Sequence, residues 1–276
     1  MAQLADILIK SGIDTSSLTA AFKVGRDWVH RLTVHGSEAV PTWKQLRKLV
    51  SHTSHWPVLL GTDFDLEILA ETLEDQKDQS AAKIMQRAEK VDPAALFDDW
   101  QKTAMENCRE AAVEFGSGGK LDEKFERQLA QEAPFQALPR GDWPEYAEPS
   151  DEFSIPYDVL TRKPQKSVHI GLVPTVTGWE APAFLKFGSW NACPHPEHHV
   201  AVMKYWHSQY GTEVVGITHD IVEMLVARPP RSRKKALELA REQYLYCEDI
   251  VDQGTETIDN LAATLLNGKT WYFWWD

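Results

Sequence analysis

The chain has 276 residues, of which 43% are hydrophobic and 25% are charged, and its formal net charge is −12. This composition is typical of a soluble globular protein with a buried core, and the length fits two domains. A negative field of this size repels DNA and RNA, and no apolar run reaches the roughly 18 residues of a membrane span, so we expect neither a nucleic-acid nor a membrane partner.

The N-terminus and the cysteines indicate a cytoplasmic protein. The opening MAQLADILIKSGID places charged residues among its apolar ones and lacks a basic start, which predicts a short amphipathic helix and not a signal peptide. Cys108, Cys193 and Cys247 are odd in number and far apart, so they do not predict a disulfide framework. Free thiols suit the reducing cytosol.

Helical periodicity dominates the first half of the chain. The stretch PTWKQLRKLV (41–50) predicts a helix that begins at Pro41, because its apolar residues recur at helical spacing. Two short strands are expected on either side of a turn at Gly25, and WPVLLG (56–61) has the length and composition of a buried strand. Further helices are predicted for DLEILAETLEDQ, SAAKIMQRAEKV, DPAALFDDWQKTAMENCREAAVEF and LDEKFERQLAQEA.

The segment 133–167 differs from the sequence on both sides of it. Its prolines, its acidic residues and its few periodic apolar positions predict a linker or a segment wrapped along a surface. We therefore expect a helix-rich α+β N-terminal domain over residues 1–132 and a second domain over residues 168–276. Trp143 and Phe153 indicate that the segment between the domains packs on another part of the chain.

The C-terminal domain alternates strands and helices. Strands are expected at 168–175, 213–218, 221–227 and 270–275, with a helix at 196–210 and two more in RSRKKALELAREQYLYCEDIV and TIDNLAATLLN. This order, β-α-β-β-α-α-β, matches a split β-α-β sandwich with one inserted helix. The predicted fold class is thus α+β, with a C-terminal antiparallel or mixed sheet covered by helices.

Four stretches of this C-terminal sequence are distinctive: GWEAPAFLKFGSWNACPHPEHHVAVMKYWHSQYGTEVVGITHD, ARPP, EQYLYCEDIVDQGTETI and the terminal WYFWWD. Over about residues 168–276 they closely resemble bacterial proteins that carry domain of unknown function 4253. HWPVLLG is similar to the leader region that often precedes this domain. The resemblance supplies no catalytic residues. Because some families of this kind sit beside bacterial toxins as immunity proteins, it implies that role as one candidate function.

The stretch NACPHPEHHV (191–200) gathers a cysteine and three histidines. Its spacing does not favour a zinc site, because Pro196 pushes His195 out of the helical region and there is no second ligand pair elsewhere. The adjacent His198 and His199 diverge around a helix. The stretch instead predicts a helix start, with His199 in a stripe that faces a sheet. We predict neither a bound metal nor a cofactor.

Two other chemistries stay open as alternatives. An enzyme with a Cys/His site, with or without a metal, would use Cys193, His195, His198 and His199. An anion-binding regulator would use a basic cluster at a helix start, Arg228, Arg231, Arg233 and Lys234. The competing interpretation of that cluster is a solvated basic patch.

The ending WYFWWD is aromatic on both faces of a predicted strand. Alternation places Trp271, Phe273 and Trp275 on one face, which is expected to lie in the core, and Tyr272 and Trp274 on the other. The second face is either buried by the N-terminal domain or the linker, or it binds a partner, since Trp and Tyr are enriched at interfaces.

The sequence therefore predicts a non-catalytic interaction protein, with an immunity protein that binds and neutralises a basic toxin domain as the specific form. No G-x-S-x-G, H-E-x-x-H, Walker or G-x-G-x-x-G motif occurs, and the net charge complements a basic protein partner. The predicted partner-binding residues are Tyr272, Trp274, Glu71, Glu74, Asp75 and Asp78.

Overall fold

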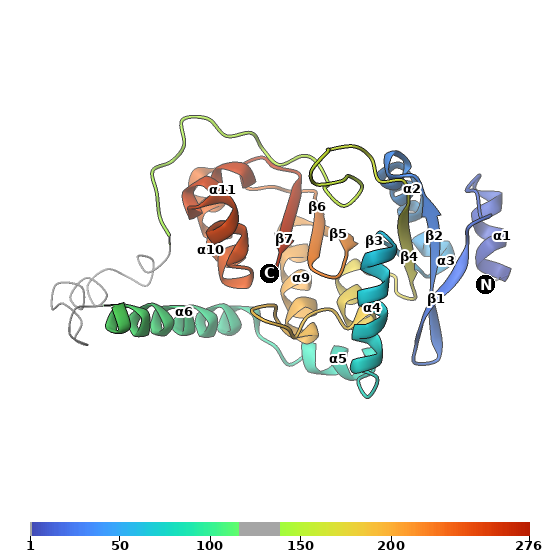
Figure 1. Ribbon diagram of the computed structural model, residues 1–276, viewed down its shortest axis with the longest axis horizontal. Helices are drawn as coiled ribbons and strands as arrows, with labels where there is room; N and C mark the ends of the chain where they lie inside the picture. Colours follow the sequence, from blue (N-terminus) through green and yellow to red (C-terminus); the bar gives the residue numbers. More distant parts are fainter. Residues whose placement is uncertain (1, 116–138) are drawn as a thin grey trace. The chain divides into compact units, whose positions relative to one another are not determined.

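Within residues 2–115 and 139–276, which the computed structural model describes, seven strands form one mixed sheet (Figure 1). The strands are β1 (Thr19–Val24), β2 (Asp27–Val34), β3 (Trp56–Gly61), β4 (Val168–Val173), β5 (Thr212–Ile217), β6 (Ile221–Val226) and β7 (Thr270–Trp274). Their order in the sheet is β1-β2-β4-β3-β5-β6-β7. All neighbouring pairs are antiparallel except β3 and β5, which are parallel.

Helices occupy most of the remaining described chain and confirm the α+β class. They are α1 (Ala2–Lys10), α2 (Gly36–Lys48), α3 (Val50–Thr53), α4 (Asp63–Asp75), α5 (Ala81–Ala88), α6 (Pro93–Phe115), α8 (Ala181–Leu185), α9 (Pro196–Tyr210), α10 (Arg233–Tyr246) and α11 (Ile258–Leu265), with a 3-10 turn η1 (Gly178–Glu180) and a π-helical turn η2 (Ile250–Thr255). The predicted helix LDEKFERQLAQEA lies outside the described residues. None of the described helices is long and apolar enough to cross a membrane.

The N-terminal strands follow the sequence pattern, whereas one helix start does not. β1 and β2 pair around Gly25, whose φ of 66° is the left-handed conformation that glycine adopts readily, and all of β3 is buried, as predicted. The predicted start at Pro41 is wrong, because α2 begins at Gly36. The ring of His35 accepts a hydrogen bond from the amide of Ser37 and caps the helix earlier, so the proline lies inside it.

α9 covers one face of the sheet with an aromatic core. The Trp206 ring stacks on Phe273 with centroids 5.5 Å apart and meets Trp271 edge-on at 5.4 Å. Trp271, Phe273 and Trp275 are all buried. The predicted inward face of the last strand is therefore confirmed.

Part of the proline-rich segment packs on the opposite face of the sheet. Glu223 of β6 is buried and accepts hydrogen bonds from the amide and the hydroxyl of Ser154 and from the amide of Ile155. Burial raises the pKa of Glu223 to about 7, although these hydrogen bonds oppose the shift. The side chain of Ile155 fills the space above Gly216, where a Cβ atom would lie 2.3 Å from it. Residues 151–167 are thus attached to the sheet.

The described chain forms two compact units that differ from the predicted domains. One unit comprises Met1–Val91, Asp151–Arg228 and Lys269–Asp276, and the other comprises Asp92–Ser150 and Pro229–Gly268. The predicted boundaries at residues 132 and 168 do not coincide with these units. The physical reason is strand pairing, since β3 from the N-terminal part of the chain lies between β4 and β5 and completes their hydrogen bonds.

Candidate functional site

The parallel pairing of β3 with β5 brings polar residues from distant segments to one edge of the sheet. Leu59 pairs with Gly216, so the two strands end at the same edge. Asp65 lies in the first turn of α4, directly after β3, and His219 and Asp220 form the turn after β5. The carboxyl ends of adjacent parallel strands are a common location for binding sites.

Asp65, His219 and Asp220 form a close polar cluster at this edge. His219 Nδ1 lies 2.7 Å from Asp65 Oδ1 and 3.4 Å from Asp220 Oδ1. The hydrogen bond with Asp65 raises the pKa of His219, although partial burial opposes the shift. Burial disfavours the charged form of Asp65, but hydrogen bonds from His219 and Thr62 outweigh it, so the pKa of Asp65 is lowered. The two carboxylates therefore favour the charged form of the imidazole.

Two aromatic side chains, Phe64 and Trp274, contact this cluster, and Tyr272 lies two positions before Trp274 in β7. We call these three residues the aromatic end. The exposed ring of Phe64 meets His219 edge-on, with centroids 5.3 Å apart. Trp274 is half-buried, and its Nε1 donates a hydrogen bond to Asp220 Oδ2 at 3.0 Å. Tyr272 is 42% exposed, so the outer face of β7 offers aromatic surface to solvent.

Exposed acidic residues follow α4 and the turn after it, and we call them the acidic face: Glu67, Glu71, Glu74, Asp75 and Asp78. α4 itself has no basic residue, and it buries its other side through Leu66, Leu69 and Leu73. Lys77, which follows the helix, pairs with Glu74 at 3.2 Å. Since both of these side chains are well exposed, the pair contributes little to stability and leaves the surface acidic.

The aromatic end and the acidic face meet at the first turn of α4. The Phe64 ring contacts that of His219, and His219 Nδ1 lies close to Asp220 Oδ1. Asp220 in turn accepts a hydrogen bond from Trp274. Of these two sets, the sequence analysis predicted Tyr272, Trp274 and four of the acidic residues. It did not predict Phe64, Glu67 or the cluster that joins the two sets. The available signals were the aspartates of TDFD after a buried strand and the His219–Asp220 pair between two strands.

The second half of the chain contains a match to a known protein family. Residues 169–276 match the model of the family described as Domain of unknown function (DUF4253). The chain carries a DUF4253 domain. No curated protein and no solved structure matches the chain. The match begins within β4, so the DUF4253 domain supplies His219, Asp220 and the last strand, whereas Asp65 and the acidic face lie outside it.

Within the DUF4253 domain, the stretch 191–200 begins a helix as predicted. His195 is the N-cap in an extended conformation, and α9 starts at the next residue. His199 is fully buried, and its Nε2 lies 3.4 Å from the sulfur of Cys193, which is also buried. Burial lowers the pKa of His199 to about 3, so its ring is neutral. The predicted position of His199 in a buried stripe is confirmed.

The other two histidines of this stretch do not join the buried pair. His195 is exposed, and its Nδ1 lies 2.8 Å from the hydroxyl oxygen of Ser189. Burial lowers the pKa of His198, whose ring lies 5.5 Å from that of His195. Among the side chains that the structure describes, residues 2–106 and 139–276, three or more potential ligand atoms converge only at Asp65, His219 and Asp220.

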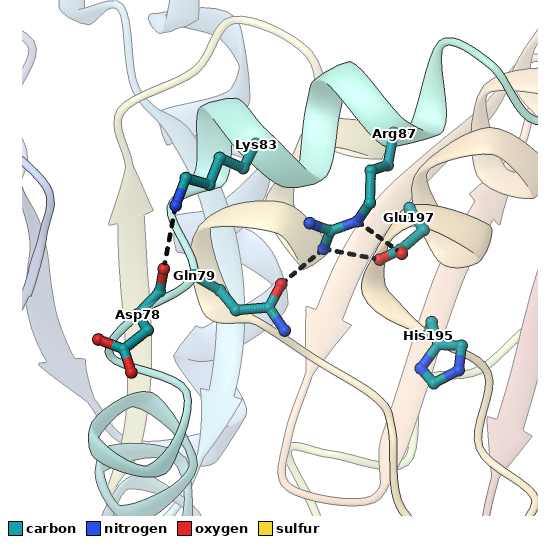
Figure 2. Close-up of a pocket in the computed structure, with 6 residues that line it drawn as sticks. All are labelled: Asp78, Gln79, Lys83, Arg87, His195 and Glu197. Atoms are coloured by element: carbon teal, nitrogen blue, oxygen red, sulfur yellow. Dashed lines mark hydrogen bonds and ion pairs between the residues drawn. The ribbon is translucent and has the colours of Figure 1, made fainter.

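A pocket of about 400 Å³ lies between α5 and the start of α9 (Figure 2). Arg87 spans it and donates to both carboxylate oxygens of Glu197, at 2.7 and 3.2 Å, and to Gln79 at 2.6 Å. Burial disfavours a charged Glu197, but the bonds from Arg87 outweigh it and lower the pKa of Glu197. The ion pair of Arg87 with Glu197 thus attaches α5 to α9, which favours a structural role for these two residues.

The four predicted anion-binding residues divide between the two compact units. Arg228 ends the middle segment of the first unit, where its Nη2 donates to the carbonyl of Ser208 at 3.0 Å. Arg231, Arg233 and Lys234 belong to the second unit. Arg228 therefore interacts with the last turn of α9, where a cation is favoured by the helix dipole.

In the second unit, each of the three basic residues contacts a neighbouring side chain, and for Lys234 this is Glu238, whose Oε1 lies 4.0 Å from Nζ. Arg231 Nη1 donates to Asn267 Oδ1 at 3.1 Å, and the guanidinium of Arg233 lies 4.2 Å from the centre of the Trp143 ring. Lys234 is exposed. The arginines thus have partners within the unit, and this favours a structural role for them over an anion site.

Proposed function

We propose that this protein is a non-catalytic interaction protein that binds a basic protein partner through the acidic face and the aromatic end. In its specific form it is an immunity protein that neutralises a cognate bacterial toxin. The observation that carries the proposal is that the exposed ring of Phe64 and the acidic face belong to the same helix, α4, and the turn after it. The acidic face supplies five exposed carboxylates, Glu67, Glu71, Glu74 and Asp75 from α4 and Asp78 from the turn.

The two surfaces supply complementary parts of binding. Exposed carboxylates attract a basic partner over distance and accelerate association. Aromatic side chains supply the buried contacts that hold a complex together, and their loss is felt in the dissociation rate. Phe64, Tyr272 and Trp274 are suited to this second role because each is exposed or half-buried.

The Cys/His enzyme alternative has weaker support. A nucleophilic thiol needs solvent access and a base that can take its proton, whereas Cys193 and His199 are both buried in the core of the DUF4253 domain. Cys193 and Cys247 are both buried. We also propose that the protein acts in the cytoplasm, because its three cysteines are odd in number and far apart in the sequence.

Association kinetics with the product of the neighbouring gene test the proposal. We expect the association rate to fall at least about tenfold between 0.05 and 0.5 M salt, because the Debye length shortens about threefold, while the dissociation rate changes less. At low salt, Glu71→Lys/Glu74→Lys should slow association by about tenfold. The matched control Asp98→Lys/Asp99→Lys makes the same change in charge at two exposed positions of α6 and should have a smaller effect.

Substitutions in the aromatic end should change the dissociation rate of the complex. Trp274→Ala or Tyr272→Ala should raise the dissociation rate and leave the association rate nearly unchanged. Equal effects of the two charge reversals would contradict a role for the acidic face. If Cys193→Ser abolished protection against the toxin while binding stayed intact, the enzyme alternative would replace the proposal.

A further inference from the structure

The cluster of Asp65, His219 and Asp220 has the composition of a metal site. We propose that these three side chains bind one divalent transition-metal ion, for which Zn²⁺ is the probe. This proposal departs from the sequence-based prediction that the protein binds no metal. That prediction rests on the spacing within residues 191–200 and on the lack of a second ligand pair in the sequence, and it does not consider residues that meet only in the fold. The proposal is independent of partner binding through the acidic face.

The spacing of the three ligand atoms fits a single small ion. One nitrogen and two oxygens, from three side chains, all lie within 4.8 Å of one another. His219 Nδ1 is 2.7 Å from Asp65 Oδ1 and 3.4 Å from Asp220 Oδ1. Ligands at about 2.1 Å from a common ion lie about 2.9 to 3.4 Å apart, so both distances from His219 are already close to those of a metal site. The two aspartate oxygens, which lie within 4.8 Å of each other, would move toward the ion on binding.

Hydrogen-bond donors outside the cluster orient the carboxylates of Asp65 and Asp220, as the ligands of a metal site are oriented. Asp65 Oδ2 accepts hydrogen bonds from the amide and the hydroxyl of Thr62, at 2.7 and 2.9 Å. Asp220 Oδ2 accepts one from Trp274 Nε1 at 3.0 Å. In each carboxylate, Oδ2 is therefore held by a donor and Oδ1 lies toward His219. Asp220 Oδ1 also accepts a hydrogen bond from the Thr218 hydroxyl at 3.0 Å, which fixes its position further. Partners of this kind orient the ligands in metal sites and increase metal affinity.

Charge and access indicate the class of ion. Two carboxylates offset the charge of a divalent cation, and the imidazole nitrogen favours transition metals over Ca²⁺ and Mg²⁺, which prefer oxygen ligands. The ion would displace the proton of His219 Nδ1. The side chains of His219, Asp65 and Asp220 are 25%, 14% and 23% exposed, so solvent reaches the cluster and the remaining coordination positions can hold water.

Calorimetric titration of the chelator-treated full chain with Zn²⁺ tests the proposal. We expect saturable binding of one ion per chain at micromolar concentrations and a rise in thermal stability on binding. His219→Gln removes one ligand and should weaken binding by at least about 100-fold, more than the roughly 10- to 100-fold cost of losing an outer partner. Trp274→Phe keeps all three ligands, removes the donor to Asp220, and should weaken binding by about tenfold.

A double variant at the other histidine-containing stretch is the matched control. His195→Gln/His198→Gln removes two imidazoles from the start of α9 and should bind Zn²⁺ within about twofold of the unchanged protein. Absence of saturable binding, or full affinity in His219→Gln, would overturn the site and leave a hydrogen-bonded ion cluster. Loss of Zn²⁺ binding in the double control would mean that the metal site lies at residues 195–198 instead. Partner association in Glu71→Lys/Glu74→Lys is a separate measurement, so either proposal can fail alone.

Discussion

Two regions of the molecule hold histidines in opposite settings. His199 lies in the core against Cys193 and aromatic rings, and burial lowers its pKa to about 3. His219 lies at the edge of the sheet between Asp65 and Asp220, and its pKa is raised. The stretch around His199 contains the cysteine and histidine residues that are typical of metal and catalytic sites. The edge has the charge and the solvent access that such a site needs.

The comparison shows that the surroundings of an imidazole decide its chemistry more than the number of ligand-type residues nearby. In the core, a charged ring would lose its hydration without gaining a carboxylate, so the ring stays neutral and contributes to packing. At the edge, carboxylates stabilise either a proton or a cation on the same ring atom. The first two predictions below test this difference, and the third, with a smaller effect, tests the same principle of burial on the carboxyl group of Glu223.

Alanine substitutions should separate the two regions most strongly. His199→Ala leaves a cavity beside the rings of Phe187 and Trp275, whose centroids lie 4.9 and 5.5 Å from that of His199. We expect it to lower the free energy of unfolding by about 4 kcal/mol. His219→Ala, in chelator-treated protein, should cost less than about 1 kcal/mol, because the side chain is partly exposed. Urea unfolding at neutral pH measures both, and similar losses would remove the distinction.

Acid should destabilise the core through His199. Its pKa is about 3 in the folded chain, against a reference value of 6.5, so between these pH values the unfolded chain binds a proton that the folded chain does not. Between pH 7 and pH 4 this difference lowers the free energy of unfolding by about 3 kcal/mol. His199→Gln lacks this titration, so urea unfolding should show that the variant loses about 3 kcal/mol less than the unchanged chain over that range. Parallel losses would mean that the ring is hydrated or charged in the folded state.

The buried carboxyl group of Glu223 should give a smaller effect of opposite sign. Its pKa is about 7 in the folded chain, against a reference value of 4.5, so the folded chain keeps a proton that the unfolded chain releases. The resulting stability is present below pH 4.5 and is lost as the pH rises through about 7. Between pH 5 and pH 7.5, Glu223→Gln should therefore gain about 2 kcal/mol relative to the unchanged chain, measured by urea unfolding. An unchanged difference between the two proteins would show that Glu223 is ionised in the folded state.

Local patterns explain which elements the sequence could predict. α9 has Pro196 at its first position and Gly211 as a left-handed cap, and both signals act within a few residues of the helix ends. The alternation of aromatic residues in β7 likewise predicts which side chains enter the core. α2 is the exception, because a histidine cap at His35 is a weaker sequence signal than the proline at position 41.

The candidate site could not be predicted in this way. Asp65 and His219 are separated by 154 positions, and only the parallel pairing of β3 with β5 brings them into contact. A buried strand such as WPVLLG has apolar residues on both faces, so its sequence does not show which neighbours it takes or in which direction. The difference between the compact units and the predicted domains has the same origin.

The sequence by itself determined the α+β class, most helix and strand positions, the inward face of the last strand and the resemblance to the DUF4253 family, because each depends on short-range periodicity or on conspicuous motifs. Tertiary structure decided that β3 is inserted between β4 and β5, that His199 is neutral, and that Asp65, His219 and Asp220 meet beside the aromatic end. These properties depend on strand pairing and burial between residues far apart in the chain. The local sequence pattern carries no information about which distant residues come together.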